Sequence, residues 1–540
     1  MIVRRSLTVR RLLLLLLTCS AAFLHALTVQ SAPDGRRDQE STAFFAGPSQ
    51  TFLITVTPKA ANQLRREPRT YVPATVQVGT TVYTNVGIHL KGAAGSTRDF
   101  DDRPALTLNF DKFVKGQKCN GLEKLHLNNS VQDDTYLSES IASRLYLDCG
   151  VPTARSGHAF VNLNGRDLGL YVLKEGYDSL FLKRNFLPGT NAPGNLYDGG
   201  FLQDVDQQLE LDAGNGPKDY SDLRQLRKAA NTPESRRAPE LERVLDVDRF
   251  LTFLAIQALT DDWDGYGRNR NNYRLYFDPR TGRANFIPHG MDQLFRELNA
   301  PLDPQWQGMV AWSVFELPSM QARYRDRLRS IVTNRFTWTW VTNHLASVDA
   351  RLQPGLGKRS PGERQDWARE LQGVAKRMAG RIRSARRQLD LPPEPAFAQL
   401  SVIARKPQIL TGWQPRPQQG LSKLESVSIE GRQTVHLVAS KGGTVASFRT
   451  SRSLDAGTYV FEAMARTQGL VARDGPPGRG AGIRISGLDR HNQLTEDQDW
   501  KPLRFDFELD EDREVDFIIE IRADRGEAWF DLSSLKLTLQ

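Results

Sequence analysis

The sequence predicts an α+β protein in which a mixed N-terminal region is followed by an all-β sandwich or jelly roll. Short runs of alternating polarity, separated by turn residues, fill residues 52–113 and are typical of strands. Apolar residues at helical spacing occur at 137–145 and at 250–259. From about residue 422 the period returns to two, with six or more short runs and no helical signal, which predicts the sandwich.

Composition excludes several classes of protein. The chain has 540 residues, of which 39% are hydrophobic and 25% charged, with 42 Gly and 28 Pro. These values exclude a disordered, a collagen-like and a polytopic membrane protein. The net charge of +9 includes four arginines in the first eleven residues. Because Lys and Arg form no stripe interleaved with aromatic residues, nucleic acid is not expected as a partner.

The N terminus has the pattern of a signal peptide, which we place at residues 1–32. Four arginines precede a long apolar run, and Ser31-Ala32 supplies the small residues of a cleavage site. One alternative is an uncleaved anchor helix, because residues 12–29 approach the ~20 apolar residues that span a bilayer. Lipidation of Cys19 is a minor option, since Thr18 is a poor match to a lipobox. We expect the mature chain to be secreted or extracytoplasmic, at the cell surface or in the periplasm.

Two cysteines remain once the leader is removed, Cys119 and Cys149. In an oxidising compartment they would form one disulfide bond, and two buried free thiols are the equal alternative. The sequence contains no HExxH, CxxC or GxSxG motif. The usual signatures of metalloproteases and serine hydrolases are therefore absent.

The first region is read as strands around one helix. Its four expected strands lie at residues 52–56, 74–82, 86–90 and 106–110. A helix with apolar residues four apart begins near Leu137 and ends at Gly150. A β-hairpin follows at residues 159–173, with its turn at Asn164-Gly165.

The middle of the chain alternates between polar and helical stretches. Residues 210–240 are polar and are expected to be mostly loop, whereas residues 250–259 predict a largely buried helix. Residues 323–389 are helical and strongly basic, and we interpret their positive charges as a solvated helix face. Pro residues then predict a linker at 391–417, before a sandwich domain at 418–540.

The polar segment at residues 261–276 is the strongest candidate for chemistry. It follows the buried helix and runs into a strand, and a second strand at 284–288 leads directly to Asp292. Phosphoryl transfer to a hydroxyl needs an Asp that accepts the proton, an Asn a few residues later, and an Asp after the next hairpin that holds Mg²⁺. Asp264 and Asn269 match this spacing. The alternative is a turn whose side chains bond their own backbone.

Short motifs along residues 50–390 resemble, in order, those of the CotH family, the spore-coat-protein-H-like kinases. They are VGIHLKG at 86–92, the segments 121–129, 150–152, 161–175 and 194–197, WDGY at 263–266, NNYRLY at 271–276, and IPHGMDQLF at 287–295. Because many motifs recur together, the resemblance is specific. It implies an atypical protein-kinase-like fold at residues 40–390 that binds ATP and Mg²⁺ and phosphorylates Ser or Thr of protein substrates.

The resemblance also implies roles for individual residues. Asp264 corresponds to the catalytic Asp and Asp292 to the metal-binding Asp. Asn272 is our choice for the second metal ligand, with Asn269 and Asn271 as close rivals.

For two glutamates the same resemblance leaves two interpretations open. Glu139 lies where a kinase has its ion-pairing helix Glu, and a solvated helix carboxylate is the equal alternative. Glu175 ends a buried strand near the expected hinge, where it either contacts nucleotide or pairs with Lys174 or Lys183.

The sequence departs from the family pattern at several positions. Arg103 stands where the family usually has Lys, and the two are not interchangeable, so Lys91 is a second candidate for the residue that clamps phosphate. Gly290 replaces the first Asp of an Asp-x-Asp motif. A kinase-type Gly-rich loop is absent, and residues 92–96 either cover phosphates or form a simple turn. ATP is also scarce outside the cytoplasm.

The C-terminal region resembles carbohydrate-binding modules of the galactose-binding, jelly-roll kind. The supporting positions are 448–450, 457–459, 483–487, Trp500 and 529–532. Trp500 either stacks on a sugar or is buried in the core, and the core is the favoured interpretation.

We therefore predict a secreted or surface CotH-type kinase of extracytoplasmic or coat proteins, with an appended sandwich that binds glycan or protein. One alternative is a catalytically inactive kinase-like scaffold that acts through the sandwich, and another is an accessory to a glycan-directed enzyme. Asp264 and Asp292 favour catalysis, whereas Arg103 and the compartment favour the scaffold.

Overall fold

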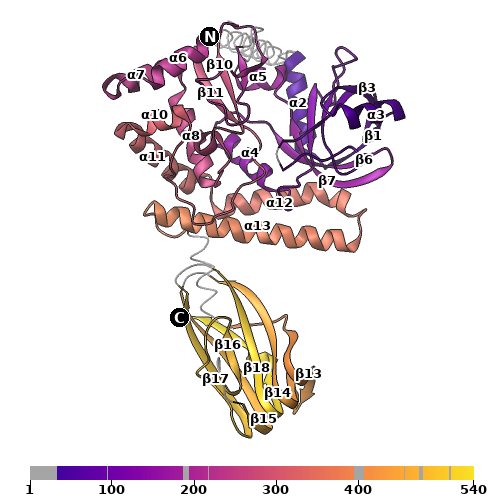
Figure 1. The fold of residues 1–540 in the computed structure, drawn as a ribbon, viewed down its shortest axis with the longest axis vertical. Coiled ribbons are helices and arrows are strands. Elements are labelled where there is room, and N and C mark those ends of the chain that lie inside the picture. Colours follow the sequence, from indigo (N-terminus) through magenta and orange to yellow (C-terminus); the bar gives the residue numbers. More distant parts are fainter. Residues whose placement is uncertain are drawn as a thin grey trace, which may run out of the picture. The chain divides into compact units, whose positions relative to one another are not determined.

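The computed structural model describes residues 33–93, 95–186, 194–216, 218–394, 407–454, 457–473, 478–509 and 513–540. The chain divides into two compact units, Met1–Leu391 and Pro392–Gln540 (Figure 1). The expected signal peptide at residues 1–32 lies outside the described residues. Within the described part of the chain, no helix is long and apolar enough to cross a membrane.

The first unit begins with a closed seven-stranded barrel, in the order β1-β2-β3-β4-β5-β7-β6. Its strands are β1 (Gln50–Thr55), β2 (Val72–Val78), β3 (Thr81–Lys91), β4 (Ala105–Asn109), β5 (Lys124–Asn128), β6 (Ser156–Leu163) and β7 (Arg166–Glu175). Alternate Leu, Ile and Val side chains fill the interior, because successive residues of a strand face opposite sides. The predicted hairpin is confirmed, with Asn164 and Gly165 both at positive φ between β6 and β7. Parallel pairing of β1 with β6 closes the barrel.

Four helices accompany the barrel: α2 (Pro33–Ala46), α3 (Pro58–Arg66), α4 (Ser138–Asp148) and α5 (Ser179–Asn185). The predicted helix near Leu137 is α4, and its apolar side chains are buried. The Asp133 carboxylate accepts the N–H of Ser138 at 2.9 Å and so satisfies the first turn. Helix α4 contacts both β6 and α8 (Val247–Leu259), so it lies between the barrel and the remainder of the unit (Figure 1).

The second half of the first unit is a small sheet surrounded by helices. The sheet has the order β11-β10-β8-β9, formed by β8 (Leu196–Asp198), β9 (Glu210–Ala213), β10 (Tyr273–Asp278) and β11 (Arg283–Pro288). The remaining helices are α6 (Ser221–Ala230), α7 (Glu234–Val244), α9 (Tyr266–Asn269), α10 (Met309–Phe315), α11 (Pro318–Asn334), α12 (Trp338–Leu356) and α13 (Pro361–Gln388). Every residue of α8 from Phe250 to Leu259 is buried, as the sequence predicts, whereas Asp248 in its first turn is exposed.

The expectation of loops at residues 210–240 is wrong, because this stretch contains β9, α6 and most of α7. In α6 the buried side chains are Leu223, Leu226, Ala229 and Ala230. The buried stripe of α6 is narrow and half of it is alanine. The helical spacing of its apolar residues is therefore hard to recognise among the polar residues around them.

The interpretation of the basic stretch as a solvated face is also incomplete. Arg381 of α13 is fully buried, and its guanidinium donates to the carbonyl oxygens of Ala258, Leu259, Leu298 and Ala300 at 2.7–2.9 Å. Two of these carbonyls end α8, where a cation also opposes the negative end of the helix dipole. Burial lowers the pKa of Arg381 to about 10. Arg381 therefore fixes the end of the helix that leads into residues 261–276.

Replacing Arg381 with Met keeps the side-chain volume and removes a donor from four buried carbonyl groups; those of Ala258 and Ala300 keep a second donor, whereas those of Leu259 and Leu298 lose the donor described above. Each unsatisfied buried acceptor costs about 1–3 kcal/mol, so we expect the melting temperature of the first unit to fall by about 5 °C or more. Circular dichroism during heating measures this fall. The matched control is Arg387→Met, on the exposed face of the same helix, and an equal fall in both variants would contradict the assignment.

The second unit is a β-sandwich whose long strands branch. Its strands are β12 (Gln408–Ile409), β13 (Gln414–Ile429), β14 (Arg432–Leu454), β15 (Gly457–Ala472), β16 (Gly480–Ile485), β17 (Gln498–Leu509), β18 (Arg513–Asp531) and β19 (Lys536–Leu539), with a short helix η1 (Leu532–Ser534). Strand β18 pairs with β14 on one side, and on the other side first with β16 and then with β15. One apolar core joins side chains of β14, β15, β16, β17 and β18.

The structure decides three questions that the sequence left open: where the linker ends, whether Trp500 is buried, and whether the two cysteines are bonded. Strand β13 begins at Gln414, inside the expected linker. It tolerates its prolines because it is an edge strand, which among the described residues pairs only with β14. Trp500 lies outside the core: it is partly exposed, donates from Nε1 to Glu430 at 3.0 Å and has the Arg432 guanidinium over its ring. Cys119 and Cys149 are free thiols.

Candidate functional site

The outer face of the barrel carries a row of polar residues. Thr107 of β4, His126 of β5 and Lys174 of β7 are paired in adjacent strands, while their Leu neighbours point into the barrel. The Thr107 hydroxyl and His126 Nδ1 lie 3.1 Å apart. Strand alternation therefore places a buried lysine on the face that α4 covers.

Lys174 forms a buried ion pair with Glu139, in the first turn of α4. Both side chains are only 2% exposed. The second oxygen of Glu139 accepts the Asn128 amide at 3.0 Å, and the Asn128 oxygen accepts the Lys91 ammonium. The alternative of a solvated Glu139 is therefore wrong. Breaking such a pair costs about 3–5 kcal/mol, because one charge is left buried alone.

Lys91 is the second lysine of this cluster. It ends β3, and Ala105 on β4 is small enough to let the Lys91 side chain reach across β4 to Asn128 on β5. Burial, followed by the charge of Lys174, lowers the pKa of Lys91 to about 8. Lys174 thus pairs directly with Glu139, whereas Lys91 is joined to this carboxylate only through Asn128 and makes no ion pair among the described residues.

Asp292 faces the same cluster from the turn after β11. Burial, and then the charge of Glu139, raise the pKa of Asp292 to about 6, while Lys174 and Lys91 oppose the rise. The structure thus brings Lys91, Glu139 and Asp292 together around Lys174, although they come from four separate elements.

Asp264 lies in the loop after α8, where three amide groups converge on its carboxylate. Asn269 donates at 2.7 Å, Asn272 at 2.8 Å, and Asn271 at 3.2 Å to each oxygen. All three Asn candidates of the sequence thus contact Asp264. The cage fixes the orientation of the carboxylate, which a proton acceptor requires.

The neighbouring acids of this loop are engaged elsewhere. Asp261 pairs with Arg268 at 2.8 Å and accepts the N–H of Glu297 at 3.0 Å. Asp262 is buried and accepts from the Gln257 amide at 3.2 Å. Burial, and then the charge of Asp264, raise the pKa of Asp262 to about 7.

Asn272 connects the Asp264 loop to the turn that carries Asp292. Its Nδ2 donates to Asp264, while a Cβ on Gly290 would lie 2.4 Å from its Oδ1. Its carbonyl accepts the N–H of His289 at 3.0 Å. This geometry favours Asn272 over its rivals as the second metal ligand, because its oxygen points toward the Asp292 turn. It also explains Gly290, whose φ of 57° and close approach exclude a side chain.

The Arg103 guanidinium makes its contacts outside the lysine cluster. Its Nη2 donates to the Tyr136 hydroxyl at 2.8 Å and to the Leu170 carbonyl, and its guanidinium lies over the rings of Tyr136 and Tyr171. These contacts use the guanidinium for packing, so Lys91 and Lys174 are the better candidates for binding phosphate.

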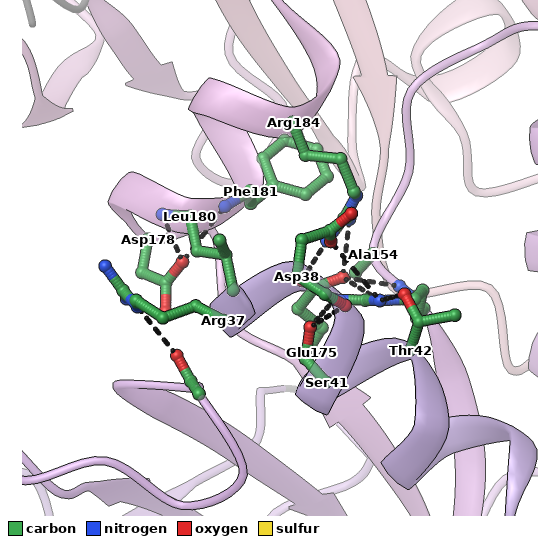
Figure 2. A network of polar contacts seen from close by, with 12 residues as sticks. Arg37, Asp38, Ser41, Thr42, Ala154, Glu175, Asp178, Leu180, Phe181 and Arg184 are labelled. Carbon is green, nitrogen blue, oxygen red and sulfur yellow. Dashed lines mark hydrogen bonds and ion pairs between the residues drawn. The ribbon is translucent and has the colours of Figure 1, made fainter. Parts of the chain in front are cut away.

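Glu175 is fully buried and is held by Arg155 and Arg184; Figure 2 shows Glu175 and Arg184 beside Asp38, Ser41 and Thr42 of α2. Arg155 donates to it at 2.9, 3.1 and 3.2 Å, and Arg184 at 2.6 and 2.8 Å. Both arginines also contact α2, through Asp38 and, for Arg155, Ser41 and Thr42. These bonds occupy both oxygens of Glu175, so its geometry favours joining α2 to the end of β7 over contacting nucleotide.

Gly95 and Ser96, in the segment at residues 92–96, lie in a turn. The Ala93 N–H donates to the Ser96 hydroxyl at 3.0 Å, and Asn129 donates to the Ser96 carbonyl at 3.1 Å. Ala94 lies outside the described residues, and a role for the turn over phosphates stays a prediction.

Sequence reasoning missed Lys174 as a site residue. It weighed this lysine only as a partner for Glu175. The available signal was a lysine directly after the apolar run of residues 170–173, in a strand expected to be buried. Asn128, which joins Lys91 to Glu139, was quoted only as part of a family motif.

The donor set fits a magnesium-bound nucleotide better than a metal held by protein alone. Among the described residues, no three His, Cys, Asp or Glu side chains converge on a metal position. Asp292 and Asn272 supply hard oxygen ligands, and Mg²⁺ is usually held by one or two carboxylates together with substrate phosphates. The ammonium groups of Lys91 and Lys174 supply the positive charge that phosphate oxygens need.

Comparisons with known proteins identify one family. A family model described as CotH kinase protein matches residues 88–387, which is more than half of the chain. Inner spore coat protein H of Bacillus subtilis is 24% identical over 260 residues, with 45% of this chain and 71% of that protein covered. Invasin CotH3 of Rhizopus delemar is 25% identical over 203 residues, with 33% and 34% covered.

Similarity to solved structures is weaker. The Helicobacter pylori proinflammatory kinase CtkA is 12% identical, with 56% of this chain and 96% of that chain covered, at a TM-score of 0.23. A score this low carries no argument about fold. The family model carries the assignment, and its range contains Lys91, Glu139, Lys174, Asp264 and Asp292. This chain belongs to the CotH kinase protein family.

Proposed function

We propose that the first unit binds ATP with Mg²⁺ and transfers the γ-phosphate to a Ser or Thr hydroxyl of a protein substrate. The observation that carries this proposal is the buried Lys174–Glu139 ion pair beside Asp292. Burying charged groups is expensive and contributes little to stability compared with apolar packing. A buried charge cluster that joins four elements is therefore better explained by a ligand than by folding.

The chain's own residues would divide the reaction between binding and proton transfer. Lys174 and Lys91 would hold phosphate oxygens, while Glu139 and Asn128 keep the two ammonium groups in place. Asp292 and Asn272 would hold Mg²⁺, which when bound neutralises charge on the phosphates. Asp264 would accept the hydroxyl proton as the substrate oxygen bonds to phosphorus and the bond to the ADP oxygen breaks. The three Asn amides would keep the Asp264 carboxylate aimed at that hydroxyl.

The relatives support a surface or coat location. One is a spore coat protein and another is an invasin, and the expected leader would deliver the chain outside the cytoplasm. This chain spans about a third of the invasin's length, so its substrates are proposed only as extracytoplasmic or coat proteins.

The test uses the protein from residue 33 onward, because α2 belongs to the Glu175 network. Calorimetry should detect ATP binding that depends on Mg²⁺, and labelled ATP should transfer phosphate to the protein itself or to a Ser-rich test protein. Absence of nucleotide binding with any divalent metal would refute the proposal.

The double variant Lys174→Met/Glu139→Gln tests the ion pair itself. Both charges are removed together, so neither is left buried alone and the fold should persist. We expect the affinity for Mg·ATP to fall by about tenfold or more, because a charge-assisted contact to phosphate is lost. Lys115→Met, at an exposed lysine of the same unit, is the control. Unchanged affinity in a folded double variant would contradict the assignment.

A further inference from the structure

The second unit has a hollow of about 280 Å³ on the outer side of β13, β14 and β18. Its lining is polar and charged, and includes Gln414, Arg416, Arg449, Thr450, Ser451 and Asp516. Across these strands, Gln414 of β13 pairs with Arg449 of β14, and Ser451 of β14 pairs with Asp516 of β18. The hollow therefore lies on a rigid sheet surface, where ligand groups would meet fixed partners.

Two arginines of the hollow have donors to spare. Among the described residues, the Arg416 side chain makes no hydrogen bond and no ion pair with a carboxylate. The Arg449 guanidinium makes one hydrogen bond, from Nε to the Ser447 hydroxyl at 3.2 Å. A guanidinium has five N–H donors, so most of those on this pair face the hollow or solvent.

The surrounding charges are unbalanced. Glu520 is fully buried and is shared by Arg484 at 3.1 Å, Arg522 at 3.3 Å and Arg490 at 3.7 Å. The single negative charge of Glu520 is thus already surrounded by three positive charges, without counting Arg449. Burial, and then the charges of Arg416 and Arg484, lower the pKa of Arg449. An anion bound between Arg416 and Arg449 would relieve this repulsion.

The other lining groups suit sugar hydroxyls. The Gln414 side chain is exposed and makes no hydrogen bond among the described residues. Asp516 uses one carboxylate oxygen for the Ser451 hydroxyl at 2.5 Å, and its other oxygen is unspent among these residues. A carboxylate beside the arginines disfavours a densely charged ligand such as a polyphosphate, but it accepts hydroxyl groups well. The volume suits one ring-sized unit of a longer chain that continues over the open sheet.

We propose that this hollow binds an acidic polysaccharide, with Arg416 and Arg449 on the carboxylate or sulfate of one sugar unit. Gln414 and Asp516 then bind hydroxyl groups of the same sugar. This site is separate from the phosphotransfer site and does not depend on the proposed kinase activity. Its effect would be to hold the protein on an anionic glycan surface.

Affinity electrophoresis and calorimetry of the full chain at 150 mM salt test the proposal. The probes are polygalacturonate, dextran sulfate, unsubstituted dextran and polyglutamate. We expect binding to one or both acidic polysaccharides and none to dextran. A preference for polygalacturonate identifies a uronate carboxylate, and a preference for dextran sulfate identifies a sulfate. Equal or tighter binding of polyglutamate would overturn the assignment to a glycan.

Variants separate a specific site from general attraction to a basic protein. Arg449→Gln and Arg416→Gln should each weaken binding by about tenfold, as expected for losing a charge-assisted contact. Arg504→Gln removes the same charge from an exposed residue of β17 that is paired with Asp506 and should change affinity by less than about twofold. Equal losses in all three variants, or no loss in the first two, would overturn the proposal. Circular dichroism checks that each variant remains folded.

Discussion

Asp292→Asn should remove Mg²⁺-dependent binding of ATP while leaving the fold intact. The amide keeps the shape of the side chain but cannot supply the anionic oxygen that Mg²⁺ requires. Loss of groups that merely support a metal ligand costs about 10–100-fold in metal affinity, so a direct ligand should cost about 100-fold or more. Calorimetry with ATP, with and without Mg²⁺, measures the change.

The melting temperature provides the control for this variant. Burial raises the pKa of Asp292 to about 6, so the folded protein carries a cost for its charged form at neutral pH. A neutral Asn removes that cost, and the melting temperature should stay equal or rise. Asp134→Asn, at an exposed acid before α4, should change neither quantity. Unchanged Mg·ATP affinity in the Asp292 variant would show that the metal assignment is wrong.

The same pKa predicts the pH dependence of binding. A carboxyl with a pKa of about 6 instead of its usual 3.8 keeps its proton up to pH 6 in the folded protein. Protons then compete with Mg²⁺, and affinity in the wild type should fall by about tenfold per pH unit below pH 6. Any residual binding of Mg·ATP by the Asp292→Asn variant should not show this fall in affinity below pH 6.

Much of the fold could be predicted because its elements have local signatures. Asn164-Gly165 fixes a hairpin turn, α8 is largely apolar from Phe250 to Leu259, and the sandwich strands alternate regularly. Closure of the barrel could not be predicted, since it depends on β1 pairing with β6 more than 100 residues away. Helix α6 escaped notice because alanine supplies half of its buried stripe.

For the candidate site, too, some residues could be predicted from the sequence and others could not. Asp264 and Asp292 could be named as candidates because they occupy motif positions with a characteristic spacing, and Glu139 because of its place on the first helix. Lys174 was missed because its partner comes from α4, and no sequence spacing relates a strand residue to a residue on a preceding helix. Arg103 has the sequence position expected of the residue that binds phosphate. Its guanidinium instead packs over the rings of Tyr136 and Tyr171, which come from distant segments of the chain. Spacing identifies which residues are candidates, and packing decides where each side chain points.

The buried arginines show the same limit for charge patterns. A run of Arg on a long helix usually faces water, and most of α13 follows that rule. Arg381 is buried instead, because the last two residues of α8 and the loop at residues 298–300 together present four carbonyl groups to its guanidinium. Nothing in the spacing of the run distinguishes this residue from its solvated neighbours.

Asp264→Asn should separate an enzyme from a scaffold. The substitution removes the proton acceptor and keeps the side-chain volume, so ATP binding should survive while phosphate transfer falls by about 10²–10⁴-fold. Some stability should also be lost, because one of the two oxygens that accept from Asn269, Asn271 and Asn272 becomes an amide donor. That loss should be about 1–3 kcal/mol.

The matched control is Asn269→Ala, which removes the 2.7 Å hydrogen bond to Asp264 but keeps the carboxylate. If Asp264 is the base, this control should lose similar stability with a much smaller loss of transfer. Melting temperature, calorimetry and transfer from labelled ATP are measured side by side for the three proteins. Equal loss of transfer in both variants would reduce Asp264 to a structural role. Full activity in Asp264→Asn would move the search to Asp262, which is buried with a pKa of about 7. A wild type that binds Mg·ATP but transfers nothing would favour the scaffold, because the lysine cluster would then serve binding alone.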